Sequence, residues 1–447
     1  MIRFAFFVTT LFIGFILQGG ISSSAQAGIF DAQKTTLDNG MQIVFIPNHR
    51  APVATHMVWI KAGAVDEPRG LSGLAHYLEH LMFKGTKTTE PGEFSRTVKA
   101  YGARHNAFTS RDFTAYFESV AVDYLDEVMR LNADRMENLQ PPQEEILSEK
   151  QVVLEERRER VDNRTKNQFR EHLVASHYLT HPYANPVIGW MDEIERIDWG
   201  HAKAFYDQFY VPNNMILVVT GDLDFETVIK MAEHHYGGLK GRPLPSREMP
   251  VLPSLPGDLT LNYSGDEIHQ SRVTKIYTAP SYSQDKEASL ALQVLIEIIN
   301  GEPTTYLHDK LVVDDKLASS VSVYYSSFSR YQSTIFINAV PNDGISNHQL
   351  DRAIVTYLAS LAEEGIENDT VQDAKKRLIA ESVYARDSLQ GPAMIVGRAL
   401  STGIPLEDIE LWDKAINQVT GDQVMDALKT YLVYPERAPS TGFLSPA

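Results

Sequence analysis

The pattern of apolar and polar positions predicts two α/β units of similar plan. In the first unit, strands are predicted where apolar and β-branched residues alternate or cluster, at residues 35–46 (a hairpin around Asn39-Gly40), 53–62, 107–120 and 215–219. Helices are predicted where apolar residues recur at helical spacing, at residues 74–84, 93–101, 125–136, 142–160, 169–177, 200–209 and 226–236. This first unit ends near residue 240.

The second unit repeats the order of the first. We expect a strand at 273–278, a helix at 285–300 closed by Gly301, two strands within 319–340, and three or four helices from His348 onward. When Ala279 is placed on Ala62, the second unit has Gln293-Val294-Leu295-Ile296-Glu297-Ile298 where the first has a pair of histidines. We interpret this as a duplicated domain of which only the first copy holds metal. The alternative is that two unrelated α/β units align by chance.

Residues 242–257 separate the two units. This stretch has five prolines and no hydrophobic periodicity, which is typical of a semi-rigid linker. About 420 residues follow residue 27, which is too many for one hydrophobic core and suits two domains of roughly 200. We therefore expect an α+β chain with similar α/β domains at 28–241 and 258–447. Each would have an antiparallel-rich sheet with helices packed on one face.

The first 27 residues have the pattern of a signal peptide. A short basic lead precedes an apolar stretch from Phe4 to Leu17, and Ser24-Ala25-Gln26-Ala27 ends in a small-x-small site. We expect cleavage after Ala27 and a periplasmic protein. An uncleaved membrane anchor is the alternative, but the apolar stretch has about 14 residues and a spanning helix needs about 20. No other segment is long and apolar enough to cross a bilayer.

Composition narrows the possible metal ligands. The chain has no cysteine, which excludes disulfides, thiolate ligands and a lipoprotein anchor and leaves His, Asp and Glu. Its formal net charge of -17 disfavours binding to nucleic acid or to an anionic membrane and mildly favours cationic peptides. An acidic surface that simply keeps the protein soluble explains this charge equally well.

The helix predicted at 74–84 carries candidate catalytic chemistry. Ser72 is a plausible N-cap and Gly85 a plausible stop, and His76 and His80 stand one turn apart on the same face. Two imidazoles at this separation can share one tetrahedral zinc, and Glu79 leans toward the same edge. The order His-x-x-Glu-His is an inverted zinc peptidase signature. The alternative is a helix with two core-edge histidines bonded to backbone carbonyls.

A third ligand is expected on the acidic helix at 142–160, which Pro142 opens. Glu149 and Glu156 are two turns apart on one face of this helix, whereas Glu155 points elsewhere. Glu155 stays as the alternative ligand. We expect the remaining glutamates of the helix to form a solvated face.

Several further segments resemble segments of a known protein family and occur in the same order along the chain. They are Asn106-Ala107-Phe108-Thr109-Ser110, His181-Pro182-Tyr183 with Gly189 after it, and Tyr210-Val211-Pro212-Asn213-Asn214-Met215 running into Thr220-Gly221-Asp222. Together with the inverted motif and its distant glutamate, they resemble the pitrilysin family of zinc peptidases, in its mitochondrial processing peptidase branch. The resemblance covers nearly the whole chain after residue 27.

The resemblance implies a clamshell of two similar halves and a zinc endopeptidase. One zinc ion would be held by His76, His80 and Glu156, with a water in the fourth position that Glu79 activates. Glu149 would orient a ligand histidine through its other ring nitrogen. The alternative for Glu149 is an ordinary surface carboxylate.

By the same analogy, the substrate lies as an added strand along the predicted strand at 107–120. Asn106, just before this strand, and Ala107 and Phe108, at its start, would line the cleft. Core packing is the alternative role for Phe108.

One departure from the family pattern concerns a possible partner. Family members that work alone carry an arginine and, seven residues later, a tyrosine in the second half, where this chain has Val312 and Ser319. Neither can donate to a substrate carbonyl as that pair does. We therefore expect a heterodimer in which a homologous metal-free subunit supplies the pair. The alternatives are a non-catalytic peptide-binding or scaffold subunit and, more weakly, a zinc-storing exported protein.

Overall fold

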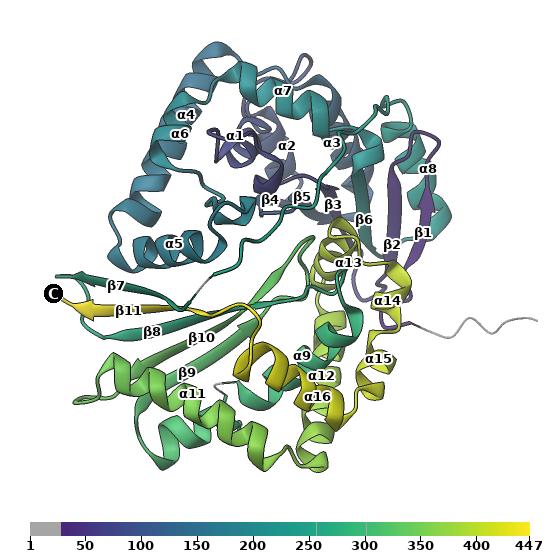
Figure 1. The fold of residues 1–447 in the computed structure, drawn as a ribbon. Helices are drawn as coiled ribbons and strands as arrows, with labels where there is room; N and C mark the ends of the chain where they lie inside the picture. The colour runs from purple at the N-terminus through teal and green to yellow at the C-terminus, as the bar shows by residue number, and fades with distance from the viewer. Residues whose placement is uncertain (1–27, 256, 301) are drawn as a thin grey trace, which may run out of the picture.

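Two mixed β-sheets with helices packed against them organise the chain (Figure 1). The computed structural model describes residues 28–255, 257–300 and 302–447. The predicted signal peptide and the predicted helix stop at Gly301 lie outside the described residues. Among the described residues, no helix combines the length and the apolar character needed to cross a membrane.

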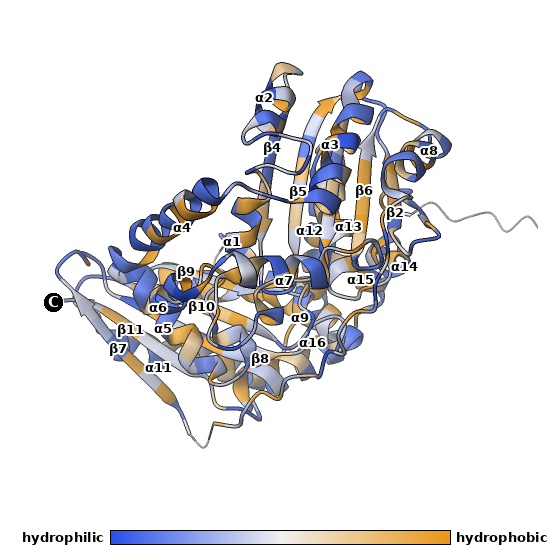
Figure 2. Cartoon of the chain, turned by 90° about the horizontal axis from the view of Figure 1, so that it is seen from above, coloured by the Kyte–Doolittle hydropathy of each residue, from blue (hydrophilic) through white to orange (hydrophobic). Residues whose placement is uncertain are grey.

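The first sheet has six strands in the order β1-β2-β6-β3-β5-β4. Its strands are β1 Gln33–Thr36, β2 Gln42–Pro47, β3 Val53–Ile60, β4 Arg104–Thr109, β5 Thr114–Ala121 and β6 Met215–Gly221. Strands β2 and β6 are parallel and the other neighbours are antiparallel. Every residue of the central strand β6 is buried, and Figure 2 shows this strand in orange, whereas α4 is largely blue. Strand β4 lies at the edge of the sheet.

The helices of the first half agree with the predicted periodicity, with α6 in addition. They are α1 Leu74–Leu81, α2 Glu93–Ala100, α3 Leu125–Asn138, α4 Gln143–Arg157, α5 Thr165–Tyr178, α6 Met191–Arg196, α7 Trp199–Phe209 and α8 Phe225–Tyr236. A π-helical turn, η3 (Arg158–Asp162), joins α4 to α5. Helix α1 begins after Gly73, whose φ of 90° suits glycine, rather than after Ser72, and it ends before the expected stop at Gly85.

The second sheet has five strands in the order β7-β11-β8-β10-β9. Its strands are β7 Leu259–Gly265, β8 Arg272–Ala279, β9 Ala318–Tyr325, β10 Ser333–Pro341 and β11 Ser440–Pro446. The helices are α9 Lys286–Ile299, α10 Tyr306–His308, α11 Asn347–Glu364, α12 Asn368–Asp387, α13 Gly391–Ser401, α14 Leu406–Glu410, α15 Trp412–Gln418 and α16 Gly421–Leu428. The described residues 241–255 contain no helix or strand. The domain limits at 28–241, 242–257 and 258–447 stay predictions.

The two sheets share one topology, as the predicted duplication requires. The order β2-β6-β3-β5-β4 of the first sheet matches β7-β11-β8-β10-β9 of the second, and each has one parallel pair at the equivalent place. Helix α1 follows β3 as α9 follows β8. The fold is therefore two α/β domains of one plan, and α9 stands where the first domain carries its histidines.

Each domain also covers the sheet of the other. Helix α13 of the second domain packs on β3 and β6, and α5 of the first domain packs on β7 and β11. The approach is close, because a Cβ on Gly397 of α13 would lie 2.0 Å from the Trp59 ring, and Phe169 of α5 sits over Gly442 in the same way. Helices were predicted on one face of each sheet. The other face of each sheet is covered by a helix of the other domain.

Two sequence predictions about the elements were wrong. Residues 107–120 are not one strand but belong to a hairpin, because the Ser110 hydroxyl accepts hydrogen bonds from the backbone of Asp112 and Phe113 (both 3.2 Å) and turns the chain. From residue 347 onward there are six helices rather than three or four, followed by β11. That last strand was missed because three of its five buried residues, Ser440, Thr441 and Gly442, are not apolar and hide the hydrophobic pattern.

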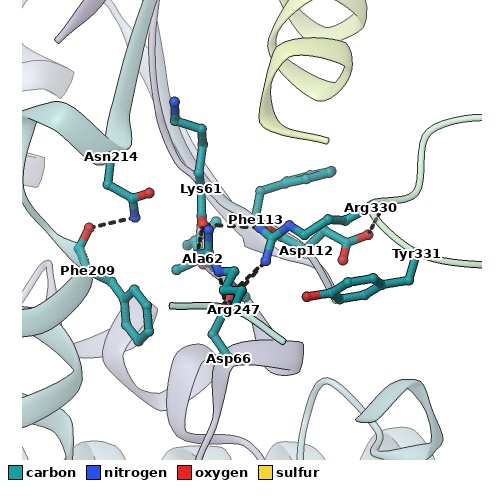
Figure 3. Close-up of polar contacts among 12 residues, drawn as sticks. Lys61, Ala62, Asp66, Asp112, Phe113, Phe209, Asn214, Arg247, Arg330 and Tyr331 are labelled. Carbon is teal, nitrogen blue, oxygen red and sulfur yellow. Dashed lines mark hydrogen bonds and ion pairs between the residues drawn. The ribbon is translucent and has the colours of Figure 1, made fainter. Parts of the chain in front are cut away.

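A buried ion-pair cluster joins the two domains (Figure 3). Arg330, in the loop between β9 and β10, reaches the Asp66 carboxylate at 3.2 and 3.3 Å and the Lys61 carbonyl at 3.1 Å. Its backbone N–H donates to Asp112 (3.2 Å), and Arg247 of the inter-domain segment donates to Asp66 at 2.7 Å. Three separate parts of the chain therefore meet at one carboxylate.

Candidate active site

Helix α1 is anchored at its N-terminus by a buried carboxylate. Glu67 accepts hydrogen bonds from the backbone N–H groups of Gly73 (3.1 Å) and Ala75 (2.8 Å), where unpaired helix donors need an acceptor. Burial raises the pKa of Glu67 well above its ordinary value, and these two hydrogen bonds oppose that rise. The start of the helix is fixed next to His76 as a result.

Helix α4 is held beside α1 by a direct contact. The Tyr77 hydroxyl donates to the Ile146 carbonyl of α4 at 2.7 Å, and both residues belong to the core under the first sheet. The buried Leu74, Leu78 and Leu81 hold α1 on that core, and His76 and His80 line a cavity of about 790 Å³. Helical spacing in the sequence predicted that His76 and His80 lie on one face of this helix.

The cavity brings together His76, His80 and Glu156. The Glu156 Oε2 atom lies 3.3 Å from His80 Nε2 and 3.7 Å from His76 Nε2, and the three candidate ligand atoms lie within 4.8 Å of one another. Ligand atoms at about 2.0–2.2 Å from a tetrahedral zinc are themselves about 3.3–3.6 Å apart. Glu156 Oε2 is buried without a hydrogen-bond partner in the described chain, so a divalent cation fits here.

The neighbouring charges act differently on the two imidazoles. Burial lowers the pKa of His76 to about 4. Burial acts in the same direction on His80, but its contacts with the Glu149 and Glu156 carboxylates raise the pKa of His80 to about 9. The two imidazoles therefore differ: His76 favours its neutral form, whereas His80, which lies between two carboxylates, favours its charged form.

Glu149 lies behind His80. Its Oε1 atom is 2.8 Å from His80 Nδ1, and its Oε2 atom is 2.5 Å from Lys84 Nζ. The contact fixes the ring so that Nε2 faces Glu156. In contrast, Glu155 is exposed and pairs with Arg158 at 3.1 Å, away from the cavity.

Glu79 lines the cavity and has one close partner. The Thr109 hydroxyl, at the end of β4, donates to Glu79 Oε2 at 2.5 Å. Burial raises the pKa of Glu79, and the bond from Thr109 opposes that rise. A carboxyl group in such an environment can accept a proton and return it.

The edge strand β4 forms one wall of the cavity. Asn106, Ala107 and Phe108 line it together with His105 and Thr109. The ring of Phe108 also packs edge-on against Trp59, with ring centroids 5.6 Å apart, so this residue belongs to the core as well. An extended chain could pair with the free edge of β4.

Several lining residues were missed by the sequence analysis. Thr109 follows the Asn106-Ala107-Phe108 segment, and Arg160, 2.7 Å from Glu156 Oε1, stands four residues after that glutamate, so sequence spacing could have found both. Val187 and Ile188, which line the cavity from a loop, had no such signal.

The two positions at which this chain departs from the pattern lie elsewhere. Val312 packs against the hydrophobic core that the two domains share, and the Ser319 hydroxyl donates to the Val340 carbonyl at 3.3 Å.

Comparisons with known proteins match most of this chain to one family. Residues 42–190 match the family described as "Insulinase (Peptidase family M16)", and residues 197–378 match "Peptidase M16 inactive domain". The chain is 32% identical over 345 residues to the zinc protease PqqE of Helicobacter pylori, covering 76% of this chain and 77% of that protein. It is 27% identical over 412 residues to a probable mitochondrial-processing peptidase subunit beta of Schizosaccharomyces pombe, covering 88% and 87%.

Solved structures show the same fold. A protease from Helicobacter pylori superposes with a TM-score of 0.85 at 28% identity, covering 93% of this chain and 99% of that one. The first half of the periplasmic protease PqqL from Escherichia coli gives a TM-score of 0.78 at 19% identity, covering 94% and 93%. At that identity the second likeness concerns the fold alone.

Proposed function

This chain belongs to peptidase family M16, the insulinase-like peptidases, and we propose that it is a zinc-dependent endopeptidase that cleaves peptides or unfolded segments. The observation that carries the proposal is the convergence of His76, His80 and Glu156 in the cavity that Glu79 also lines. A scaffold or zinc-storing protein has no use for a partly buried carboxyl group at that place.

Six residues of the site have roles in the proposed reaction. His76, His80 and Glu156 would hold one zinc ion, which supplies the Lewis acidity that a water nucleophile needs at neutral pH. Glu79 takes a proton from the attacking water and passes it to the departing amine. Glu149 keeps His80 in its orientation through Nδ1, and Thr109 holds the Glu79 carboxylate.

We propose that substrate binds as an added strand on β4. An edge strand presents unpaired backbone groups, so main-chain hydrogen bonds hold an extended peptide with little demand on its side chains. Asn106, Ala107 and Phe108 line the cavity on this strand, next to Glu79. This mode suits peptides and unfolded segments rather than folded proteins.

Removal of the metal is expected to abolish cleavage reversibly. We expect the purified chain to contain one zinc ion, to lose turnover of a fluorogenic peptide after treatment with a chelator, and to regain it with equimolar zinc. Turnover that persists in metal-free protein would contradict the proposal. Full activity with two or more tightly bound ions would contradict the single site.

We further propose that the working enzyme is a heterodimer. Val312 and Ser319 offer no donor like the arginine and tyrosine that the family pattern has there, so a homologous metal-free subunit would supply them. We expect the chain alone to turn over peptides slowly and a subunit carrying that pair to raise the rate by about 10²-fold or more. Full activity of the isolated chain, with no gain on addition of the subunit, would refute the heterodimer.

We also propose a periplasmic location, with cleavage after Ala27. The proposal rests on the sequence of residues 1–27. The fold neighbour from Escherichia coli is itself described as a periplasmic protease.

A further inference from the structure

A second cavity, of about 410 Å³, lies where α5 of the first domain passes over the open face of the second sheet. We call it the basic groove and define it by six of its lining residues: Lys166, Arg170, Arg272, Thr274, Tyr324 and Asn338. Two of its cations come from α5 and the third from the start of β8. No carboxylate is among the described residues that line it.

The cations of the groove have no ion-pair partner in the part of the chain that the structure describes. Lys166, Arg170 and Arg272 form no ion pair with any described residue, although the chain carries a net charge of -17. Arg272 is half-buried, and burial, with no opposing carboxylate, lowers its pKa. Burying an unpaired guanidinium is costly, so its retention here points to a charge that arrives with a ligand.

The floor of the groove offers donors and an aromatic face. On three neighbouring strands, Asn338 lies opposite Thr274 and Ser322 in the register of the sheet. The Thr274 hydroxyl donates to Asn338 Oδ1 at 2.9 Å, which leaves the amide nitrogen of Asn338 free to donate. Tyr324 is 60% exposed. Cations and neutral donors without a fixed negative charge suit carboxylates.

The groove lies within reach of the proposed active site. Arg160 and Val161 line the active-site cavity, and the chain continues through η3 into α5, which carries Lys166. Six residues of chain span at most about 22 Å. A further cavity of about 510 Å³ shares Lys166 and Arg272 with the basic groove and is also lined by Arg164 and by one carboxylate, Glu267. An extended peptide of six or more residues is therefore long enough to span the distance between the active-site cavity and the basic groove.

We propose that the basic groove binds carboxylates of the peptide substrate several residues away from the cleaved bond. The groove thus favours substrates with an acidic segment or a nearby C-terminus, against the repulsion of the acidic protein as a whole. This inference rests on the proposed peptidase function and specifies its substrates.

Binding of labelled peptides tests the groove without requiring turnover. The full chain with Glu79→Gln is titrated with a fluorescent peptide that carries three Asp residues at one end, and with the same peptide carrying Asn. Each is made with a free and an amidated C-terminus. We expect the Asp peptide, or the free C-terminus, to bind about tenfold more tightly than its neutral counterpart, by anisotropy at low salt. A difference between the Asp and Asn peptides would show that the groove binds side-chain carboxylates. A difference between the free and the amidated C-terminus would show that it binds the terminal carboxylate.

Three variants connect this preference to the groove. Arg272→Gln and, on the exposed helix surface, Arg170→Gln should each remove most of the tenfold preference and weaken its salt dependence. Lys230→Gln, which removes an exposed charge on α8, should leave it unchanged. Equal binding of all four peptides would refute the proposed role of the groove. An equal loss of the preference in Lys230→Gln would refute it as well. Peptides that bind with this preference but are never cleaved by the wild type would instead refute the peptidase.

Discussion

Replacing Glu79 with Gln is expected to lower peptide turnover by about 10²- to 10⁴-fold while the bound zinc stays in place. The amide has the size of the carboxylate and can still accept the hydrogen bond from Thr109, but it cannot take a proton from the attacking water. Because His76, His80 and Glu156 are untouched, the metal content should equal that of the wild type. Turnover and metal analysis on the same preparation check both halves of the prediction.

The neighbouring glutamates of α4 provide matched controls. Glu156→Gln should lose zinc and activity together, because it removes the oxygen that lies 3.3 Å from His80 Nε2. Glu155→Gln should retain both, since Glu155 is exposed and pairs only with Arg158 among the described residues. A zinc-free Glu155→Gln variant beside a zinc-loaded Glu156→Gln variant would reverse the ligand assignment. Near-normal turnover in Glu79→Gln would remove its role as the base.

Local periodicity explains why the two helices of the site could be predicted. The spacing of Leu74, Leu78 and Leu81 places His76 and His80 on one face, and Pro142 marks the start of α4. These signals depend on residues within one or two turns of each other. The hairpin of β4 and β5 was missed because its turn contains neither glycine nor proline, so the aromatic stretch looked continuous.

The contacts between separate elements of the site have no local signature. Glu67 caps α1 from a preceding loop, and Glu149 of α4 reaches His80 of α1. Which acidic residue faces a histidine on another helix is decided by how the helices pack, and sequence spacing cannot supply that. The family resemblance selected Glu156, and the structure brings it to both histidines.

Packing also connects the second domain to the site. Arg330 contacts Asp66, the residue next to Glu67, and Glu67 in turn holds the N-terminus of α1. Arg330 also donates to the Asp112 carbonyl in the turn between β4 and β5. Through these contacts the second domain supports the segment that holds the start of α1 and the turn that follows β4; Figure 3 shows Arg330 beside Asp66 and Asp112.

Replacing Arg330 with Met is therefore expected to destabilise the chain by about 3–5 kcal/mol, because it leaves Asp66 and the buried Asp112 with fewer partners. The free energy of unfolding in urea measures the loss. Arg377→Met is the matched control, since Arg377 is 44% exposed and its pair with Glu297 should contribute only about 0–1 kcal/mol. Equal losses in the two variants would show that the inter-domain cluster does not stabilise the chain more than a surface ion pair does.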